Sequence, residues 1–545
     1  MRIRATIDIR TRALGICRVA FFAAASLFAD VAIPEEPSLA QSIHSRLDGA
    51  ASNDVLRPDL SAFYAARAYA PAWQEPERLA ALIDALQSLA ADGLEPKDYD
   101  VAQLVADQSN GAGADGPTDQ RAELDLRASQ AYLLALRHLH WGRVDPHRID
   151  PNYNFESAPS DATAWLRSIG AFDLPEAGAI ARVFSSARAQ HPAYTRLTDA
   201  LQRLRKIDGE GGWPAISDGA KLKPGEFDVR IPLLRRRLQL GGYLENGDAA
   251  DSTFDPSLEM ALRDFQSEQY LDADGKLGTH TRTALNVPIH ARIDQVRVNL
   301  ERARWLLREA EGDFVLVDIA GYKVTYFRSG KPVFSARAQV GMPYRSTPSF
   351  RSRISAITFN PTWTVPSTIF YTDLLPKIRT NPAILAANHI RVFDATGEEQ
   401  AATAVDWSAP RGIVLRQDAG PENSLGRVAI HFANPFGVYM HDTPHKELFA
   451  PEQRAFSSGC IRIERPLELA VRLLEDNPGW SREQVDNIVT SGETKVVGLK
   501  DPVTVLLMYW SVDTHDGVRI AFKPDVYGKD AAVLRELGRP IERRN

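Results

Sequence analysis

The hydrophobic pattern of the chain changes near residue 313, and this change limits the folds that the sequence can adopt. Before that point apolar residues recur with helical spacing, as at Leu79, Ile83 and Leu86. After it, short runs of β-branched and aromatic residues are separated by Gly and Pro, a pattern typical of strands. The 545 residues are enough for three to four domains of about 150 residues each. We therefore expect a multidomain α+β protein.

The part of the chain before residue 313 is predicted to hold two helical domains. Residues 42–205 predict a helical scaffold domain, in which one helix ends at Gly93 and another ends before Gly142. Residues 206–229 are rich in Gly and Pro and predict a linker. Residues 230–289 then predict a small module of three helices.

Residues 313–525 are predicted to form a mainly-β domain. Residues 367–425 interrupt its strand pattern with a helix near Asp373–Arg379 and with irregular chain, so we expect an inserted lid there. The strands are expected at 314–319, 323–327, 333–340, 354–365, 428–432, 438–441 and 504–510.

The first forty residues have the features of an export signal. Several arginines precede an apolar run at 19–29, and the small residues Ser38 and Ala40 suit cleavage before Gln41. We therefore expect residues 1–40 to be a signal peptide, with an uncleaved N-terminal anchor as the alternative. The formal net charge is −6 and no dense Lys/Arg run follows the N-terminus, which argues against a nucleic-acid-binding protein.

The chain has two cysteines, and removal of the signal would leave only Cys460. A lone thiol in an oxidising compartment is either a buried core residue or a reactive one. Gly459 before it lets the backbone approach a reacting group, and Arg462 adds positive charge nearby. His441 lies 19 residues upstream, and an imidazole can take the proton of a thiol that is otherwise mostly protonated at neutral pH. The sequence therefore offers a Cys–His pair for nucleophilic catalysis.

Other histidines suggest competing sites. His441 and His445 imitate the zinc motif H-E-x-x-H, which requires both histidines on one helical face. Pro444 disfavours a helix at this point, so we expect no metal site. His431 lies in an apolar strand and is expected to be a core histidine, whereas His445 is the better rival to His441 as the base.

The segment 230–289 resembles the peptidoglycan-binding module family. Asp255 is expected to cap its second helix, with Pro256 at the first helical position. A three-helix bundle without a binding role would share much of this core pattern. The resemblance is carried by Leu234-x3-Leu238, Gly242-Tyr243-Leu244, Ala261-Leu262-x2-Phe265-Gln266 and Asp274-Gly275-x2-Gly278.

The domain 313–525 resembles the L,D-transpeptidase catalytic domain, the YkuD family. Its signature is a histidine followed by Ser/Thr-His-Gly-Cys, an apolar residue and Arg or Asn. One position departs from the signature, because Ser458 replaces its second histidine. Overall the chain is similar to the large periplasmic subgroup typified by YcbB. The match consists of His441, Ser457, Gly459, Cys460, Ile461 and Arg462, supported by segments 341–348 and 360–366.

The resemblance implies acyl transfer on peptidoglycan stem peptides in the periplasm, without a metal or other cofactor. Cys460 would attack the bond between residue three of a tetrapeptide stem and its terminal D-Ala, with His441 as base and then acid. The N–H groups of Gly459 and Cys460 would form the oxyanion hole. An amine of a second stem would resolve the thioester into a 3→3 crosslink. Carbapenems are expected to acylate the thiol. The residues expected to orient the pair or bind the stem peptide are Arg462, Ser457, Tyr439 and Trp363.

Two other functions remain open at this point. One is a non-catalytic peptidoglycan-binding scaffold with a structural cysteine. The other is an L,D-carboxypeptidase that uses water as the acceptor of the acyl group.

Overall fold

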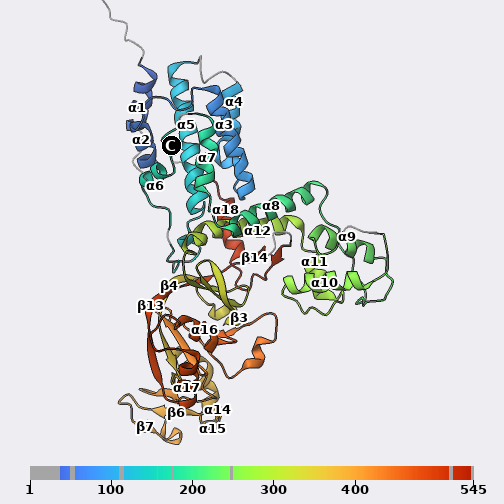
Figure 1. The fold of residues 1–545 in the computed structure, drawn as a ribbon, viewed down its shortest axis with the longest axis vertical. Coiled ribbons are helices and arrows are strands. Elements are labelled where there is room, and N and C mark those ends of the chain that lie inside the picture. Colours follow the sequence, from blue (N-terminus) through green and yellow to red (C-terminus); the bar gives the residue numbers. More distant parts are fainter. Residues whose placement is uncertain are drawn as a thin grey trace, which may run out of the picture.

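The computed structural model describes residues 37–49, 56–109, 116–155, 157–174, 176–245, 250–514 and 519–541. Cys17 and residues 1–36 of the predicted signal peptide lie outside the described residues. Within those ranges, no helix combines the length and the apolar character that a membrane span requires. A helical bundle lies at one end of the molecule, the β domain lies at the other, and three short helices form a side lobe (Figure 1).

The N-terminal bundle is built around the 24-residue helix α5 (Thr118–Trp141). Tyr132 and Leu136 of this helix are fully buried in a core shared with the surrounding helices. The predicted stop at Gly93 is confirmed by its left-handed conformation, with φ +76°. α5 also ends before Gly142, as predicted. A Cβ added at Gly142 would lie only 2.5 Å from the Glu301 and Trp305 side chains, so the position has no room for a larger residue. The other helices are α1 (Leu39–Gly49), α2 (Arg57–Ala65), α3 (Pro76–Ser88), α4 (Val101–Ser109), α6 (Thr163–Ser168) and α7 (Gly178–Ala187).

Helices α8 (Pro192–Gly209) and α12 (Ile289–Leu306) pack against each other and connect the bundle to the β domain. α8 extends to Gly209, so the predicted linker begins four residues later than expected. On α12, buried Glu301 accepts from the Val144 N–H of the bundle over 2.6 Å. Buried Asn299 of the same helix accepts from the Ser511 N–H of the β domain over 2.9 Å. α12 is therefore a shared support for both parts.

The side lobe is a three-helix module, as predicted, with its own apolar core. Asp255 caps the second helix by accepting from the Leu258 N–H, and Pro256 takes the first helical position, which confirms the predicted helix start. Leu258, Leu262 and Phe265 are all buried in this core. The helices are α9 (Ile231–Gly241), α10 (Pro256–Glu268) and α11 (Thr279–Leu285).

The β domain is a nine-stranded sheet in the order β11-β3-β12-β10-β9-β4-β13-β1-β2. An additional pairing of β2 with β3 closes the sheet on itself around an apolar core. Helices α16 (Pro466–Leu473) and α17 (Arg482–Ser491) add to that core. The hairpin β14 (Val512–Asp513) and β15 (Ala521–Phe522) and helix α18 (Asp530–Gly538) follow. The sheet strands are β1 (Phe314–Asp318), β2 (Lys323–Arg328), β3 (Lys331–Gly341), β4 (Phe350–Phe359), β9 (Val428–Phe432), β10 (Met440–His441), β11 (Ala455–Ser457), β12 (Ile461–Ile463) and β13 (Lys495–Met508).

The segment between β4 and β9 is more regular than the irregular chain that the sequence predicts. It holds a separate four-stranded sheet in the order β5-β8-β6-β7 with its own apolar core. The predicted strand 354–365 is wrong in one respect, because the chain breaks at Asn360, with φ +46°, and the following residues join this second sheet. Its elements are β5 (Trp363–Thr364), α13 (Ser367–Ile369), η6 (Phe370–Leu374), α14 (Leu375–Thr380), α15 (Ala383–Ala387), β6 (Ile390–Phe393), β7 (Glu399–Gln400) and β8 (Val414–Gln417).

Candidate active site

Two short neighbouring strands carry the predicted catalytic pair. β10 runs parallel to β12, with Met440 opposite Ile461 and His441 opposite Arg462. Side chains alternate between the faces of a sheet, so Cys460, which directly precedes β12, shares the face of His441 and Arg462. Met440 and Ile461 point the other way, into the apolar core. Strands about 4.8 Å apart that rise about 3.3 Å per residue place the backbones of His441 and Cys460 roughly 8 Å apart, which their side chains can bridge.

The loop that carries Cys460 is held by two buried hydroxyl groups. Ser457 Oγ donates to the Cys460 carbonyl over 2.6 Å and accepts from the Gly459 N–H over 3.1 Å. Thr347 Oγ1 donates to the Gly459 carbonyl over 2.8 Å and accepts from the Gly341 N–H over 2.9 Å. Gly459 has φ +115°, a conformation that L residues rarely adopt. The glycine of the signature is therefore required by the backbone of the loop.

Two expectations from the sequence change at this loop. Ser457 is 2% exposed and its hydroxyl is bonded within the loop, so it shapes the loop and does not offer a contact to a substrate. The Gly459 N–H, expected in the oxyanion hole, is already bonded to Ser457. The Cys460 N–H is in none of the hydrogen bonds among the described residues and is the better donor for an oxyanion.

The His441 ring is oriented by a backbone carbonyl. Its Nδ1 lies 2.5 Å from the carbonyl oxygen of Asp442. Because a carbonyl can only accept, Nδ1 carries the proton and Nε2 is left as the basic nitrogen. The Asp442 carboxylate is itself fixed, since it accepts from the Arg427 N–H over 2.9 Å and pairs with Lys446. This arrangement suits His441 to a role as a general base through Nε2.

The electrostatics of the site favour a neutral thiol and a neutral imidazole. Burial raises the pKa of the Cys460 thiol, although the Tyr439 backbone N–H and the charge of Arg462 oppose the shift. Burial and then the Arg462 charge lower the pKa of His441 to about 3. A resting thiolate–imidazolium pair is therefore disfavoured, and the proton must move when the sulfur attacks.

The other two histidines have different surroundings. His445 has a 63% exposed side chain that lies 3.3 Å from Glu447. His431 Nε2 lies 2.9 Å from Thr358 Oγ1 of the neighbouring strand, which fits the expected packing role. His441 lies in a strand and His445 in the loop after it, so the helical geometry of the zinc motif is absent. Across the described ranges, no three His, Cys, Asp or Glu side chains gather as metal ligands would.

Tyr439 and Trp363 lie beside the pair. The Tyr439 ring is 5.5 Å from the His441 ring and 5.7 Å from the His431 ring, centre to centre. Burial and the neighbouring Cys460 raise the pKa of the Tyr439 hydroxyl, whereas a side-chain hydrogen bond with Trp363 favours ionisation. Trp363 belongs to β5, so the second sheet contributes a side chain to the same site.

Arg345 joins the cysteine loop to the inserted segment. Its guanidinium donates to Ser458 Oγ over 3.0 Å, and on the other side to Thr372 over 2.6 Å and to Asp373 over 2.7 Å. Ser458 is the residue that departs from the family signature. An arginine from the β3–β4 connection therefore contacts the position where the family has its second histidine.

Sequence reasoning missed several groups that shape the site. Arg345 and Thr347 lie in segment 341–348, which supported the resemblance, but no role was predicted for either. Gln339, opposite Arg462 on β3, had no signal beyond its place in a predicted strand. No signal in the sequence points to the Asp442 carbonyl, because every residue carries a backbone carbonyl.

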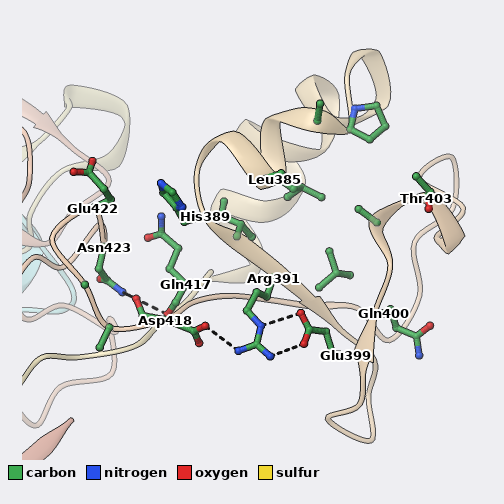
Figure 2. Close-up of a pocket in the computed structure, with 18 of the residues that line it drawn as sticks. Leu385, His389, Arg391, Glu399, Gln400, Thr403, Gln417, Asp418, Glu422 and Asn423 are labelled. Atoms are coloured by element: carbon green, nitrogen blue, oxygen red, sulfur yellow. Dashed lines mark hydrogen bonds and ion pairs between the residues drawn. The ribbon is translucent and has the colours of Figure 1, made fainter. Parts of the chain in front are cut away.

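The inserted segment also holds a cavity of about 860 Å³. Figure 2 shows it between α15 and the sheet, with Arg391 bridging Glu399 and Asp418. None of the site residues predicted from the sequence lines this cavity, so it is distinct from the catalytic face.

Three regions of the chain match known families. Residues 58–201 match the Scaffold domain, residues 229–285 match a "Putative peptidoglycan binding domain", and residues 312–505 match the L,D-transpeptidase catalytic domain YkuD. The chain is also similar to a "Putative L,D-transpeptidase" of Haemophilus influenzae, with 30% identity over 242 residues. The aligned part is 44% of this chain and 48% of that relative, so the chain spans about half the length of the curated relative.

Solved structures of L,D-transpeptidases are among those similar to the chain. The protein from Stackebrandtia nassauensis has 14% identity over 54% of this chain and 96% of its own, with a TM-score of 0.22. The fragment from Xylanimonas cellulosilytica has 14% identity over 54% of this chain and 99% of its own, with a TM-score of 0.17. From the family matches and the curated relative, the chain contains a YkuD-family L,D-transpeptidase catalytic domain together with a scaffold domain and a peptidoglycan-binding domain.

Proposed function

We propose that the protein is an L,D-transpeptidase that crosslinks peptidoglycan through a thioester on Cys460. The observation that carries the proposal is the register of β10 and β12, which puts His441 and Cys460 on one face of the sheet. The catalytic-domain match at 312–505 supports the same reaction class. The peptidoglycan-binding domain at 229–285 would hold the chain on its polymeric substrate. Export to the periplasm, where that polymer lies, is part of the proposal.

In the first half-reaction the Cys460 sulfur attacks the carbonyl that links residue three of a tetrapeptide stem to its terminal D-Ala. His441 Nε2 takes the thiol proton as the C–S bond forms, because the pair is neutral at rest. The Cys460 N–H would stabilise the oxyanion. The tetrahedral intermediate then breaks the C–N bond, and His441 returns the proton to the departing D-Ala amine. The product is a thioester on Cys460.

In the second half-reaction an amine at the side-chain end of residue three in a second stem attacks the thioester. His441 accepts a proton from that amine, the C–S bond breaks, and the proton returns to the sulfur. The new amide is a 3→3 crosslink. If water attacked instead, the product would be a shortened stem, which is the carboxypeptidase alternative. A non-catalytic scaffold would give neither product.

A product assay separates these functions. Purified disaccharide tetrapeptides are incubated with the full chain and with Cys460→Ala, and the products are separated and weighed by mass spectrometry. We expect crosslinked dimers and free D-Ala from the wild type only. Shortened monomers without dimers would favour hydrolysis. The absence of any product, or equal products from Cys460→Ala, would contradict the proposed catalytic thiol.

Covalent inhibition gives a second test. A carbapenem presents a strained amide carbonyl to the same sulfur and leaves it acylated. We expect one adduct per chain on the wild type and none on Cys460→Ala. An undiminished adduct on Cys460→Ala would contradict the assignment.

A further inference from the structure

Arg462 is a cation on the catalytic face of the sheet. It is mostly buried, and no carboxylate within the described ranges forms an ion pair with it. Burial lowers its pKa, and the charge of a Cys460 thiolate opposes the shift. A buried, unpaired guanidinium is costly, so its position beside the reactive sulfur calls for an anion that the described part of the chain does not supply.

Gln339 supplies a second donor on the same face. It lies opposite Arg462 on β3 and is fully buried. Its Oε1 accepts a long hydrogen bond of 3.4 Å from the Arg462 guanidinium. The Nε2 of the same amide therefore does not bond to Arg462. Gln339 Nε2 and Arg462 Nε are both buried, and neither has an acceptor among the described residues. Unsatisfied N–H donors on two neighbouring side chains of adjacent strands indicate a missing acceptor.

The row of side chains across three strands is Gln339, Arg462 and His441. Cys460 lies two residues before Arg462 on the same strand, about 7 Å away along the backbone. In a tetrapeptide donor, the carboxylate of the terminal residue lies only three bonds, about 4 Å, beyond the carbonyl carbon that the sulfur attacks. A donor seated on Cys460 would therefore bring that carboxylate toward Arg462.

We propose that Arg462 and Gln339 bind the terminal carboxylate of the donor stem, with Arg462 supplying the charge and Gln339 the second N–H. This assignment rests on the proposed function and adds a specificity determinant to it. A neutral carbonyl would accept from the two N–H donors but leave the charge of the guanidinium uncompensated. A carboxylate would accept from both donors and also neutralise that charge. It also gives a reason for cleavage before the last residue of the stem, because only there does a free carboxylate lie next to the scissile bond.

Stem peptides carry other carboxylates, and the experiment has to separate them. Three disaccharide tetrapeptides are compared: one with all carboxylates free, one amidated only at the terminal D-Ala, and one amidated only at the side-chain end of residue three. Binding is measured by calorimetry on the full chain with Cys460→Ala, so that no turnover intervenes. A charge-assisted hydrogen bond corresponds to roughly a tenfold to hundredfold preference. We expect that preference for the free terminal carboxylate, and no effect of amidation at residue three.

Variants at Gln339 test the second donor. Gln339→Leu should weaken binding of the free donor about tenfold and binding of the terminal amide less, because a carboxylate is a stronger acceptor than a neutral carbonyl. Gln339→Glu, nearly isosteric, should neutralise Arg462 and weaken the free donor further while sparing the amide. Equal affinities of the free and the terminally amidated donors, sensitivity to amidation at residue three instead, or equal losses for both donors in the Gln339 variants would overturn the proposal.

The test is separable from that of the proposed function. Failure of the wild type to release D-Ala or form dimers would contradict the transpeptidase reaction, whereas the binding preference is read on a chain that cannot react. Melting temperatures of the Gln339 variants identify any loss of fold, and the amide donor then serves as the internal control for the binding comparison.

Discussion

Replacing Thr347 by Val should loosen the cysteine loop without touching the reacting atoms. Thr347 is fully buried, and its hydroxyl joins the Gly341 N–H to the Gly459 carbonyl at 2.9 and 2.8 Å. Val has nearly the same shape but no hydroxyl, so both backbone groups would be left buried and unpaired. Each such group costs about 1–3 kcal/mol, so we expect a loss of about 2–6 kcal/mol in unfolding free energy or in the stability of the loop.

The size of the loss sets the expected kinetic effect. If about 2 kcal/mol of this loss is the free energy that holds the Cys460 loop in its reactive conformation, acylation should slow roughly thirtyfold, since about 1.36 kcal/mol is a factor of ten in rate. The rate is followed by intact-mass measurement of the carbapenem adduct, and stability by denaturant unfolding. Thr347→Ser keeps the hydroxyl and is the matched control. Wild-type acylation and stability in Thr347→Val, or equal losses in Thr347→Ser, would contradict the role of the Thr347 hydroxyl in holding the loop.

Four further predictions follow from the same contacts. His441→Ala should lose most of the acylation rate and His445→Ala should not, because the ring of His441 is fixed by the Asp442 carbonyl whereas His445 is exposed. The reverse order of rates would reassign the base. The folded-state pKa of His441 is about 3 against an ordinary 6.5, so the native chain binds fewer protons between these values, and stability should fall with acid by about 1.4 kcal/mol per pH unit below 6.5. At pH 5 this amounts to about 2 kcal/mol relative to pH 7, a contribution that His441→Asn should abolish in urea titrations; an unchanged pH slope in that variant would contradict the lowered pKa. The raised pKa of Cys460 predicts that iodoacetamide alkylation in the free chain is slower than that of an exposed cysteine at pH 7.5 and still increases with pH where the exposed cysteine has reached its plateau. Equal rates and equal pH profiles for the two cysteines would contradict it. Asp373→Asn should weaken the contact of Arg345 with the inserted segment and change KM for stem peptides more than Asp418→Asn, the same change at the exposed ion pair with Arg391. Equal effects would argue against a role for the Arg345 contact.

Local patterns in the sequence were enough to predict the domain order and most helix ends. Asp255 and Pro256 start α10 because capping depends only on neighbouring residues. Gly93 ends its helix for the same local reason, by adopting a left-handed conformation.

The second sheet was not predicted, because its strands are two to four residues long and pair across the chain, as Trp363 does with Gln417. Such runs are too short for an alternating pattern to stand out. The sequence-predicted chemistry of Cys460 and His441 needed only residue types, but the register that puts them on one face depends on β9, β10 and β12 pairing in space. The use of the Gly459 N–H by Ser457 is likewise a property of the folded loop.

The proposed function depends on a covalent bond between Cys460 and a stem peptide. The direct measurement mixes the full chain with a disaccharide tetrapeptide lacking an acceptor amine, quenches in acid, and records the intact mass followed by peptide mapping. We expect a mass increase equal to the disaccharide-tripeptide acyl group, located on Cys460 and removed by hydroxylamine. An unchanged mass while the peptide binds, or an adduct on another residue, would contradict it.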